Sequence, residues 1–166
     1  MKCYTIIGGV NGTGKSSLLG AIRALGEFGD VADDGGVEDC LGRNISFTQE
    51  TTLSGRKTED TAARAREQGY YVRLYYVGLD TPEECLARIA NRVRRGGHDI
   101  PENDVQRRFA GRWEAVEKIL PYCDEARFFD NDNGFVEVAE YRNGELLLKG
   151  ERRPAWITEL AGRLKG

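Results

Sequence analysis

The feature that most constrains the fold of this chain is a glycine-rich segment at residues 9–16, with the sequence Gly-Val-Asn-Gly-Thr-Gly-Lys-Ser. It fits the phosphate-binding pattern G-x-x-x-x-G-K-[ST] at every fixed position. A short β-rich run precedes it at residues 3–7, and a helix-forming run follows at 17–25. Backbone N–H groups and a helix N-terminus can then face the same phosphates. The segment predicts nucleoside-triphosphate binding. The alternative is a glycine-rich turn that binds nothing.

The chemistry of a phosphate loop gives its residues distinct roles. Glycines let the backbone curl so that successive N–H groups point at phosphate oxygens. Lys15 can reach the β- and γ-phosphates, and the Ser16 hydroxyl can ligate magnesium. The predicted cofactors are therefore ATP and Mg²⁺. The predicted cofactor-binding residues are Gly9, Asn11, Gly12, Thr13, Gly14, Lys15, Ser16 and Ser17.

Charge and cysteine usage limit the class of protein. The 166 residues include 24 Lys+Arg and 27 Asp+Glu, a net charge of −3, which gives no support to a general nucleic-acid binder. The four cysteines form no C-x-x-C pair, which is typical of reduced thiols in a cytoplasmic protein. No apolar run approaches the ~20 residues that cross a bilayer, and no signal-peptide pattern is present. We expect one cytoplasmic domain over residues 1–166, without membrane contact.

Strand and helix patterns alternate along the chain. Beyond the phosphate loop, β-rich runs occur at residues 44–49, 70–79 and 126–130, and residues 26–36 indicate a loop or a very short strand. Helices are predicted at 56–68, capped by Ser54, from Thr81 to Gly96, at 102–120 and at 154–165. Asn143-Gly144 indicates a hairpin between residues 135–142 and 145–149. This alternation predicts an α/β layered fold with a mainly parallel sheet and a C-terminal antiparallel hairpin. The buried stripe of the helix after Thr81 is predicted as Leu86, Ile89, Ala90 and Val93.

An acidic cluster, Asp30, Asp33 and Asp34, follows the first predicted helix. A phosphate-loop kinase needs a carboxylate near the γ-phosphate, because the acceptor hydroxyl must lose a proton. A carboxylate at the end of the second strand can take that proton. The alternative is a solvated polar loop.

A second set of polar residues, Glu50-Thr51-Thr52-Leu53-Ser54-Gly55, follows the β-rich run at residues 44–49. Ligands of open α/β sheets bind beyond the carboxyl ends of the strands. Glu50 and Thr52 are therefore predicted to bind hydroxyl groups of an acceptor. Thr52 or Ser54 could instead cap the next helix, and the two roles are compatible.

A third set is dense in arginine and spans two predicted helices joined by residues 96–101. Arginine spreads positive charge around a transferring phosphoryl group with fixed geometry, so the set predicts a helical lid at about residues 88–112. The alternatives are a solvated basic face, with each ion pair worth under ~1 kcal/mol, and an RNA-binding arm. His98 is predicted as a loop or lid residue, not as a base. The arginines are Arg88, Arg92, Arg94, Arg95, Arg107, Arg108 and Arg112.

Together these segments resemble the zeta-toxin-like phosphate-loop kinases, in particular a small bacterial branch. The resemblance rests on the phosphate loop and on residues 50–55, 74–80 and 92–101, and it covers most of residues 1–149. It implies a P-loop kinase-like three-layer fold that moves the γ-phosphate of ATP to a hydroxyl. In the best-known members that hydroxyl belongs to UDP-N-acetylglucosamine. An antitoxin protein is the partner that the resemblance suggests.

Site roles can be carried over motif by motif. The resemblance assigns phosphate and magnesium to Lys15 and Ser16, the base to Asp33, and acceptor binding to Glu50 and Thr52. It assigns the phosphate-clamping arginines to Arg92 or Arg95 and to Arg107 or Arg108, of which we select Arg92, Arg95 and Arg108. It places Asp130-Asn131 in the loop on the adenine side. This chain departs from the family where the second strand shrinks to residues 30–33, about ten residues before Asn44.

The sequence thus predicts an ATP- and Mg²⁺-dependent kinase with a small-molecule acceptor. The shortened segment before Asn44 motivates a hypothesis from another class, a nucleotide-binding module without transfer activity. The acceptor itself stays open, with a UDP-amino sugar as the candidate from the resemblance.

Overall fold

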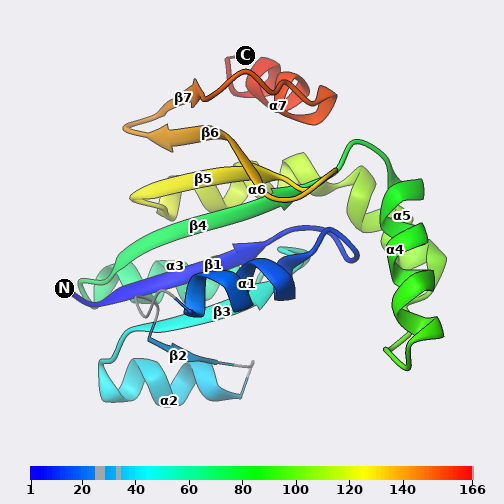
Figure 1. The fold of residues 1–166 in the computed structure, drawn as a ribbon. Helices are drawn as coiled ribbons and strands as arrows, with labels where there is room; N and C mark the ends of the chain where they lie inside the picture. The colour runs from blue at the N-terminus through cyan, green and yellow to red at the C-terminus, as the bar shows by residue number, and fades with distance from the viewer. Residues whose placement is uncertain (25–28, 33–34, 166) are drawn as a thin grey trace.

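The computed structural model describes residues 1–24, 29–32 and 35–165. Within them a seven-stranded sheet has the order β2-β3-β1-β4-β5-β6-β7 (Figure 1). The strands are β1 Cys3–Gly8, β2 Asp30–Val31, β3 Phe47–Thr51, β4 Tyr71–Gly78, β5 Glu125–Asp130, β6 Val136–Arg142 and β7 Glu145–Leu148. The helices are α1 Lys15–Arg23, α2 Gly36–Arg43, α3 Lys57–Glu67, α4 Pro82–Arg94, α5 Glu102–Ala110, α6 Arg112–Ile119 and α7 Ala155–Lys165, with a 3₁₀ turn, η1, at Leu120–Tyr122.

The first five strands of the sheet run parallel, and the last two are antiparallel. β1 lies in the centre between β3 and β4, with Ile7 level with Glu50 on one side and with Tyr75 on the other. β6 and β7 extend the sheet past β5 as an antiparallel hairpin. This arrangement confirms the predicted α/β fold with a mainly parallel sheet and a C-terminal hairpin.

The two faces of the sheet pack against different helices. One face forms the larger core, in which alternate residues of β4 (Val72, Leu74 and Tyr76) pack with side chains of α3, α6 and α7. The opposite face packs under α1, where Tyr75 and Val77 meet the leucines of that helix. Parallel strands covered on both faces are apolar almost throughout, which explains the continuous apolar run of β4.

A third, smaller cluster attaches α4 and α5 to the strand ends. Val10 and Leu79, which follow β1 and β4, pack with Cys85, Ile89, Val105 and Phe109. The two helices therefore project from the sheet as an arm, at the right of Figure 1. We use "arm" for residues 82–110. It contains most of the predicted lid.

Two turn and cap predictions are confirmed. Asn143 and Gly144 both have positive φ, 54° and 80°, as a two-residue hairpin of the primed type requires. The Thr81 hydroxyl accepts a hydrogen bond from the backbone N–H of Glu84 at 3.2 Å and caps α4. No helix of the described ranges is long and apolar enough to span a bilayer.

The structure corrects four local predictions. The sequence pattern missed α2, whose two glycines weaken its helical signal although Val37, Cys40 and Leu41 are buried at helical spacing. Ser54 does not cap α3, because its hydroxyl lies 2.6 Å from that of Thr52 and α3 has no side-chain cap.

The other two corrections concern helical packing. The helix predicted at residues 102–120 is broken at Gly111 into α5 and α6. On α4, Ala90 and Val93 are exposed, and Cys85 takes a buried position beside Ile89. The distal half of α4 projects beyond the sheet, so its apolar positions have no core to contact.

Candidate functional site

A cavity of about 480 Å³ lies at the carboxyl ends of the central strands. The phosphate loop forms one wall, the residues that follow β3 form another, and α4 and the loop after β5 close it. Strand ends of a parallel sheet meet at one edge, so residues far apart in sequence converge there. Its lining residues are Asn11, Gly12, Gly14, Lys15, Ser16, Ser17, Glu50, Thr51, Thr52, Arg88, Arg92 and Asn131.

Two glycines of the phosphate loop occupy positions that no other residue could take without displacement. Gly12 and Gly14 have φ of 86° and 106°. A Cβ on Gly12 would lie 2.4 Å from the carbonyl oxygen of Cys85, and one on Gly14 would lie 2.4 Å from the Asn131 side-chain nitrogen. The loop therefore packs with its backbone directly against α4 and the loop after β5. Gly9 and Thr13, also predicted for this site, belong to the same loop but not to the cavity lining.

Lys15 is buried at the N-terminus of α1. Its ammonium donates to the carbonyl oxygen of Gly9 at 2.7 Å. Burial lowers the pKa of Lys15 to about 8, since the charged form loses water; nearby Arg92 and Arg108 also lower it, and Glu50 opposes them. A phosphate group brought to this ammonium would supply the counter-charge that the buried side chain lacks.

Ser16 and Glu50 form a paired oxygen site. The Ser16 hydroxyl lies 3.0 and 3.1 Å from the two carboxylate oxygens of Glu50. The strand register explains the contact, because Glu50 pairs with Ile7 and so points to the same face of the sheet as α1.

This pair fits Mg²⁺. The ion takes hard oxygen ligands, and typically one or two from protein, with the rest from phosphates and water. The described residues contain no cluster of three His, Cys, Asp or Glu side chains that would favour an all-protein cage. Ser16 and Glu50 are the residues that would hold the ion. Thr52 lines the cavity beside them.

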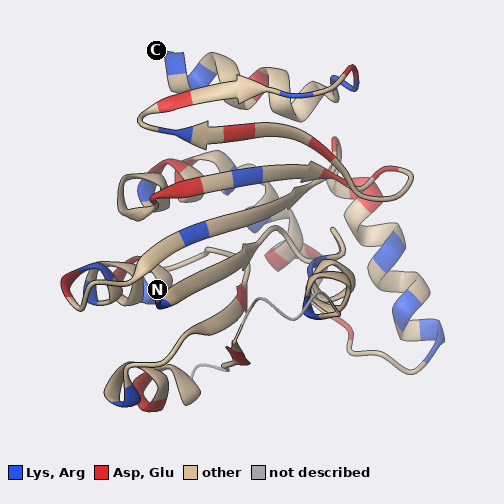
Figure 2. Cartoon of the chain, turned by 60° about the vertical axis from the view of Figure 1, so that its left-hand side comes forward, with Lys and Arg blue, Asp and Glu red and all other residues tan. Residues whose placement is uncertain are grey.

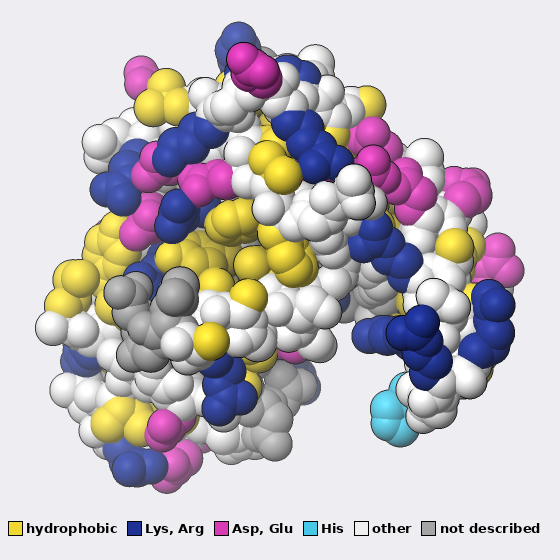
Figure 3. Space-filling model, viewed as in Figure 1, with side chains coloured by type: hydrophobic (Ala, Val, Ile, Leu, Met, Phe, Trp, Pro, Cys, Tyr) yellow, Lys and Arg dark blue, Asp and Glu magenta, His cyan; other side chains and the backbone are white. Residues whose placement is uncertain are grey.

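The arginines of the predicted lid differ in whether they reach the cavity. Figure 2 shows Lys and Arg recurring along the arm, and Figure 3 shows a hollow between the arm and the body of the molecule. Arg88 and Arg92 line the cavity. Arg108 donates to the Asn11 side-chain oxygen at 2.8 Å, so it touches the phosphate loop itself. Arg95 is exposed and does not line the cavity.

Two further arginines of the set contact other parts of the protein. Arg107 pairs with Asp104 one turn earlier on α5. Arg112 lies over the rings of Phe109 and Trp113, at 3.8 and 4.3 Å from their centroids, and pairs with Glu159 of α7. Phe109 and Trp113 are both buried, so neither ring is presented for base stacking.

The acidic cluster lies only partly within the described residues. Asp33, the predicted base, and Asp34 are outside them. Asp30 begins β2 and is exposed, and it does not line the cavity. The chain beyond β2 is held to β3 as far as Ala32, whose N–H donates to the carbonyl oxygen of Thr48 at 2.8 Å. Glu50 is the carboxylate that the described residues contribute to the cavity.

Sequence reasoning left three lining residues, Thr51, Arg88 and Asn131, out of the selected site. Arg88 was part of the arginine-dense set but was not selected, and Asn131 was placed only by the resemblance. Asn131 follows directly on β5, and a polar residue at the carboxyl end of a parallel strand is the signal that could have selected it. Arg88 lies one helical turn before Arg92, which places both on one face of α4.

Known structures share this fold at low sequence identity. A crystal structure of AvrRxo1-ORF1:AvrRxo1-ORF2 with sulphate ions has a TM-score of 0.64 at 16% identity, over 97% of this chain and 64% of that one. The AvrRxo1 complex with ATP has a TM-score of 0.62 at 17% identity, over 96% and 63%. The PezAT toxin–antitoxin system of Streptococcus pneumoniae has a TM-score of 0.61 at 13% identity, over 99% and 86%. The chain thus shares its α/β fold with these structures.

Comparison at the sequence level finds a match over only part of the chain. No protein-family model matches the chain. An uncharacterized protein of Haemophilus influenzae (strain ATCC 51907 / DSM 11121 / KW20 / Rd) is 43% identical over 67 residues, which is 40% of this chain and 48% of the relative. The match thus spans about half the length of that curated relative. The AvrRxo1 chains are likewise longer, since this chain covers under two thirds of them.

Proposed function

We propose that this protein is an ATP- and Mg²⁺-dependent phosphotransferase that moves the γ-phosphate to a hydroxyl of a small molecule. The observation that carries the proposal is the convergence of Lys15, Arg88 and Arg92 on one cavity with the Ser16–Glu50 pair. A phosphate loop alone would also suit a nucleotide switch. Cations contributed by a projecting arm suit phosphoryl transfer, in which catalysis is mostly positioning and charge stabilisation.

The proposed reaction breaks the bond between the γ-phosphorus and the β–γ bridging oxygen and forms one to the acceptor oxygen. Lys15 binds the β- and γ-phosphate oxygens, and Arg92 and Arg108 approach them from the arm. Asp33 is proposed to take the acceptor proton, and ADP leaves with the bridging oxygen. Magnesium would neutralise phosphate charge, held by Ser16 and Glu50. Arg95 could join only if the arm closes, because it is outside the cavity lining.

Glu50 has two roles open to it. The resemblance assigns it with Thr52 to the acceptor, whereas its contact with Ser16 supports a place beside the metal. We propose that Glu50 binds Mg²⁺ and that Thr52 binds the acceptor. A UDP-amino sugar is the proposed acceptor, and an antitoxin-like protein is the proposed partner. The proposal of an antitoxin-like partner draws support from the toxin–antitoxin system among the structural neighbours.

The test is release of ADP from Mg-ATP in the presence of UDP-sugars, small alcohols and aminoglycosides, with Lys15→Ala as the background control. We expect at least one acceptor to raise ADP release in the wild type and not in Lys15→Ala. If no acceptor exceeds that background, the kinase proposal fails.

A nucleotide-binding module without transfer is the second candidate. The observation that favours it is that β2 has only two residues, Asp30 and Val31. Calorimetry with Mg-ATP separates the two candidates. Tight binding without turnover, unchanged in Asp33→Asn, supports the module. Transfer that falls in Asp33→Asn excludes it.

A further inference from the structure

Asn131, the first residue after β5, contacts three separate parts of the site. Its side-chain amide donates to the carbonyl oxygen of Thr13 in the phosphate loop at 2.8 Å. Its backbone N–H donates to the carbonyl oxygen of Gly78 at the end of β4, at 3.3 Å. Its own carbonyl oxygen accepts from Arg88 of α4 at 2.6 Å. One residue thus joins the phosphate loop, the central sheet and the arm.

The contact with the phosphate loop is close and specific. A Cβ at Gly14 would lie 2.4 Å from the Asn131 amide nitrogen, so the amide lies directly against the loop backbone. The Asn131 amide holds the Thr13 carbonyl, and the Thr13 hydroxyl donates to Val10 within the loop at 2.8 Å. The carbonyl of Thr13 and the N–H of Gly14 belong to one planar trans peptide unit and point in opposite directions, so a fixed Thr13 carbonyl also fixes the direction of that N–H.

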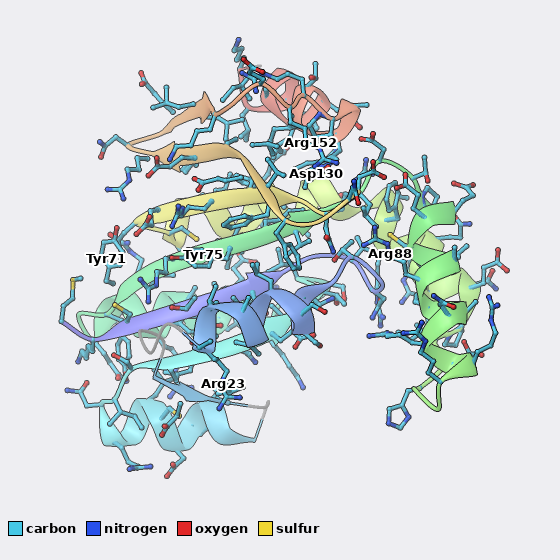
Figure 4. The ribbon with its side chains drawn as sticks, in the orientation of Figure 1. Arg23, Tyr71, Tyr75, Arg88, Asp130 and Arg152 are labelled. Carbon is cyan, nitrogen blue, oxygen red and sulfur yellow. The ribbon has the colours of Figure 1, made fainter. Side chains whose placement is uncertain are left out.

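The contact with the arm concerns the helix that carries Arg92. Arg88 donates to the carbonyl oxygens of both Asn131 and Asp132, at 2.6 and 3.2 Å. Arg92 lies one turn further along α4, so its position follows from where Arg88 is anchored. Figure 4 shows Arg88 reaching from the arm toward the end of the sheet at which Asp130 lies.

The loop itself is anchored from the far end of the chain. The buried Asp130 carboxylate accepts from the Trp156 indole at 2.8 Å and pairs with Arg152 at 3.1 Å, and Figure 4 shows Asp130 and Arg152 side by side. The backbone N–H of Trp156 also donates to Asp80, which follows β4, at 2.9 Å. These contacts of Arg152 and Trp156 hold Asp130, the residue directly before Asn131, in place.

We propose that Asn131 is a positioning residue that holds the phosphate loop and α4 in one fixed relation, so that the loop N–H groups and Arg92 face the same phosphate group. This inference rests on the proposed function, because it assigns Asn131 a part in nucleotide binding and transfer. Asn131 does not move a proton or touch the reacting atoms in this scheme. It acts through the Thr13 carbonyl and through Arg88.

The first test is amide hydrogen exchange of the protein without nucleotide, comparing wild type, Asn131→Ala and Asn133→Ala. We expect Asn131→Ala to speed exchange of the amides at residues 12–16 about threefold to tenfold, the range for one lost hydrogen bond. Asn133 is exposed and outside the cavity lining, so Asn133→Ala should match wild type. Unchanged exchange at residues 12–16 in Asn131→Ala would overturn the inference.

The second test measures Mg-ATP affinity by calorimetry and, where transfer is found, KM and kcat. Asn131→Ala should weaken ATP binding about threefold to tenfold, and Asn131→Asp more, because a carboxylate would repel the Thr13 carbonyl. Arg88→Ala should lower kcat more than it raises KM for ATP, since it releases the helix that carries Arg92. Equal affinity in wild type and both Asn131 variants contradicts the inference.

The two proposals fail in different ways. If the wild type itself binds no ATP, the proposed function is wrong, and the exchange experiment still decides whether Asn131 orders the loop. If the wild type binds ATP and Asn131→Ala binds equally well with unchanged exchange, only the positioning role is wrong. Thermal unfolding of each variant shows whether a change is local, because a global loss of stability would speed exchange throughout the sheet.

Discussion

The Ser16 hydroxyl lies 3.0 and 3.1 Å from the two carboxylate oxygens of Glu50, although the residues are 34 positions apart. The parallel register of β1 and β3 produces this contact by placing Glu50 beside Ile7, two residues before the phosphate loop begins at Gly9. The pair provides two hard oxygen donors next to the ammonium of Lys15. Its proposed role in Mg²⁺ binding can therefore be tested directly by substitution of Glu50.

Glu50→Gln should reduce the dependence of ATP binding on magnesium. The substitution keeps the shape but removes the charge, and a neutral amide is a weaker ligand for Mg²⁺ than a carboxylate. We expect the enhancement of ATP affinity by Mg²⁺ to fall about tenfold, on the scale of an interaction with a charged group. Titration of ATP with and without Mg²⁺ measures it. Glu67→Gln, exposed on α3, serves as the control and should behave as wild type. An unchanged enhancement in Glu50→Gln would place Glu50 away from the metal.

ATP affinity should depend on pH through Lys15. Burial lowers the pKa of this ammonium to about 8, and bound phosphate should raise it again because opposite charge favours the charged form. Below pH 8 the ammonium is already formed, and above pH 8 binding must take up a proton. Affinity should therefore be flat below pH 8 and weaken by up to tenfold per pH unit above it. Calorimetry in two buffers of different ionisation enthalpy should detect the proton uptake.

Lys15→Arg provides the control for that pH dependence. The guanidinium stays charged throughout the range, so the variant should bind ATP more weakly but without the loss of affinity above pH 8.

The lowered pKa of Lys15 also makes the free energy of unfolding depend on pH. Between about pH 8 and the ordinary value of 10.5, the unfolded chain binds more protons than the folded one, so stability from this group should rise with pH. Identical pH profiles for wild type and Lys15→Arg would show that Lys15 does not titrate there.

Arg92 and Arg112 should differ sharply when each is replaced by alanine. Arg92 lines the cavity, so Arg92→Ala should lower transfer on the order of 100-fold and leave the unfolding free energy nearly unchanged. Arg112 is packed against Phe109 and Trp113, so Arg112→Ala should cost about 1–2 kcal/mol of unfolding free energy. Urea unfolding and ADP release on both variants make the comparison. If Arg112→Ala lost transfer activity while keeping its stability, the division of the arginines would be wrong.

Gly78 and Gly162 should respond in opposite directions to alanine. A Cβ on Gly78 would lie 2.6–2.8 Å from three carbons of the buried Trp156 ring, so Gly78→Ala should destabilise the protein by about 1–3 kcal/mol. Gly162 is in α7 with no atom within 4 Å of such a Cβ. Gly162→Ala should therefore stabilise the protein, by roughly 0.5–1 kcal/mol, through helix propensity. Thermal or urea unfolding measures both. A neutral Gly78→Ala would show that Trp156 can move.

Elements whose signals are local could be predicted from the sequence. The phosphate loop, the cap at Thr81 and the Asn143-Gly144 turn each depend on residues close together in the chain, and the structure confirms the cap and the turn. The continuous apolar run of β4 likewise indicated a strand covered on both faces. α2 was missed because its glycines obscure a short buried stripe, and its helical form depends on the core that Val37, Cys40 and Leu41 enter.

The sequence by itself determined that the chain carries a phosphate loop in an α/β sheet, with an arginine-rich segment after the fourth strand. Only the tertiary structure decided which of those arginines face the cavity, because Arg88, Arg92, Arg107 and Arg112 look alike in sequence and differ only in what surrounds them. It also decided that Glu50 meets Ser16 and that Asn131 meets Thr13. Those contacts arise where parallel strands end at a common edge, and strand order and register are properties of the folded sheet.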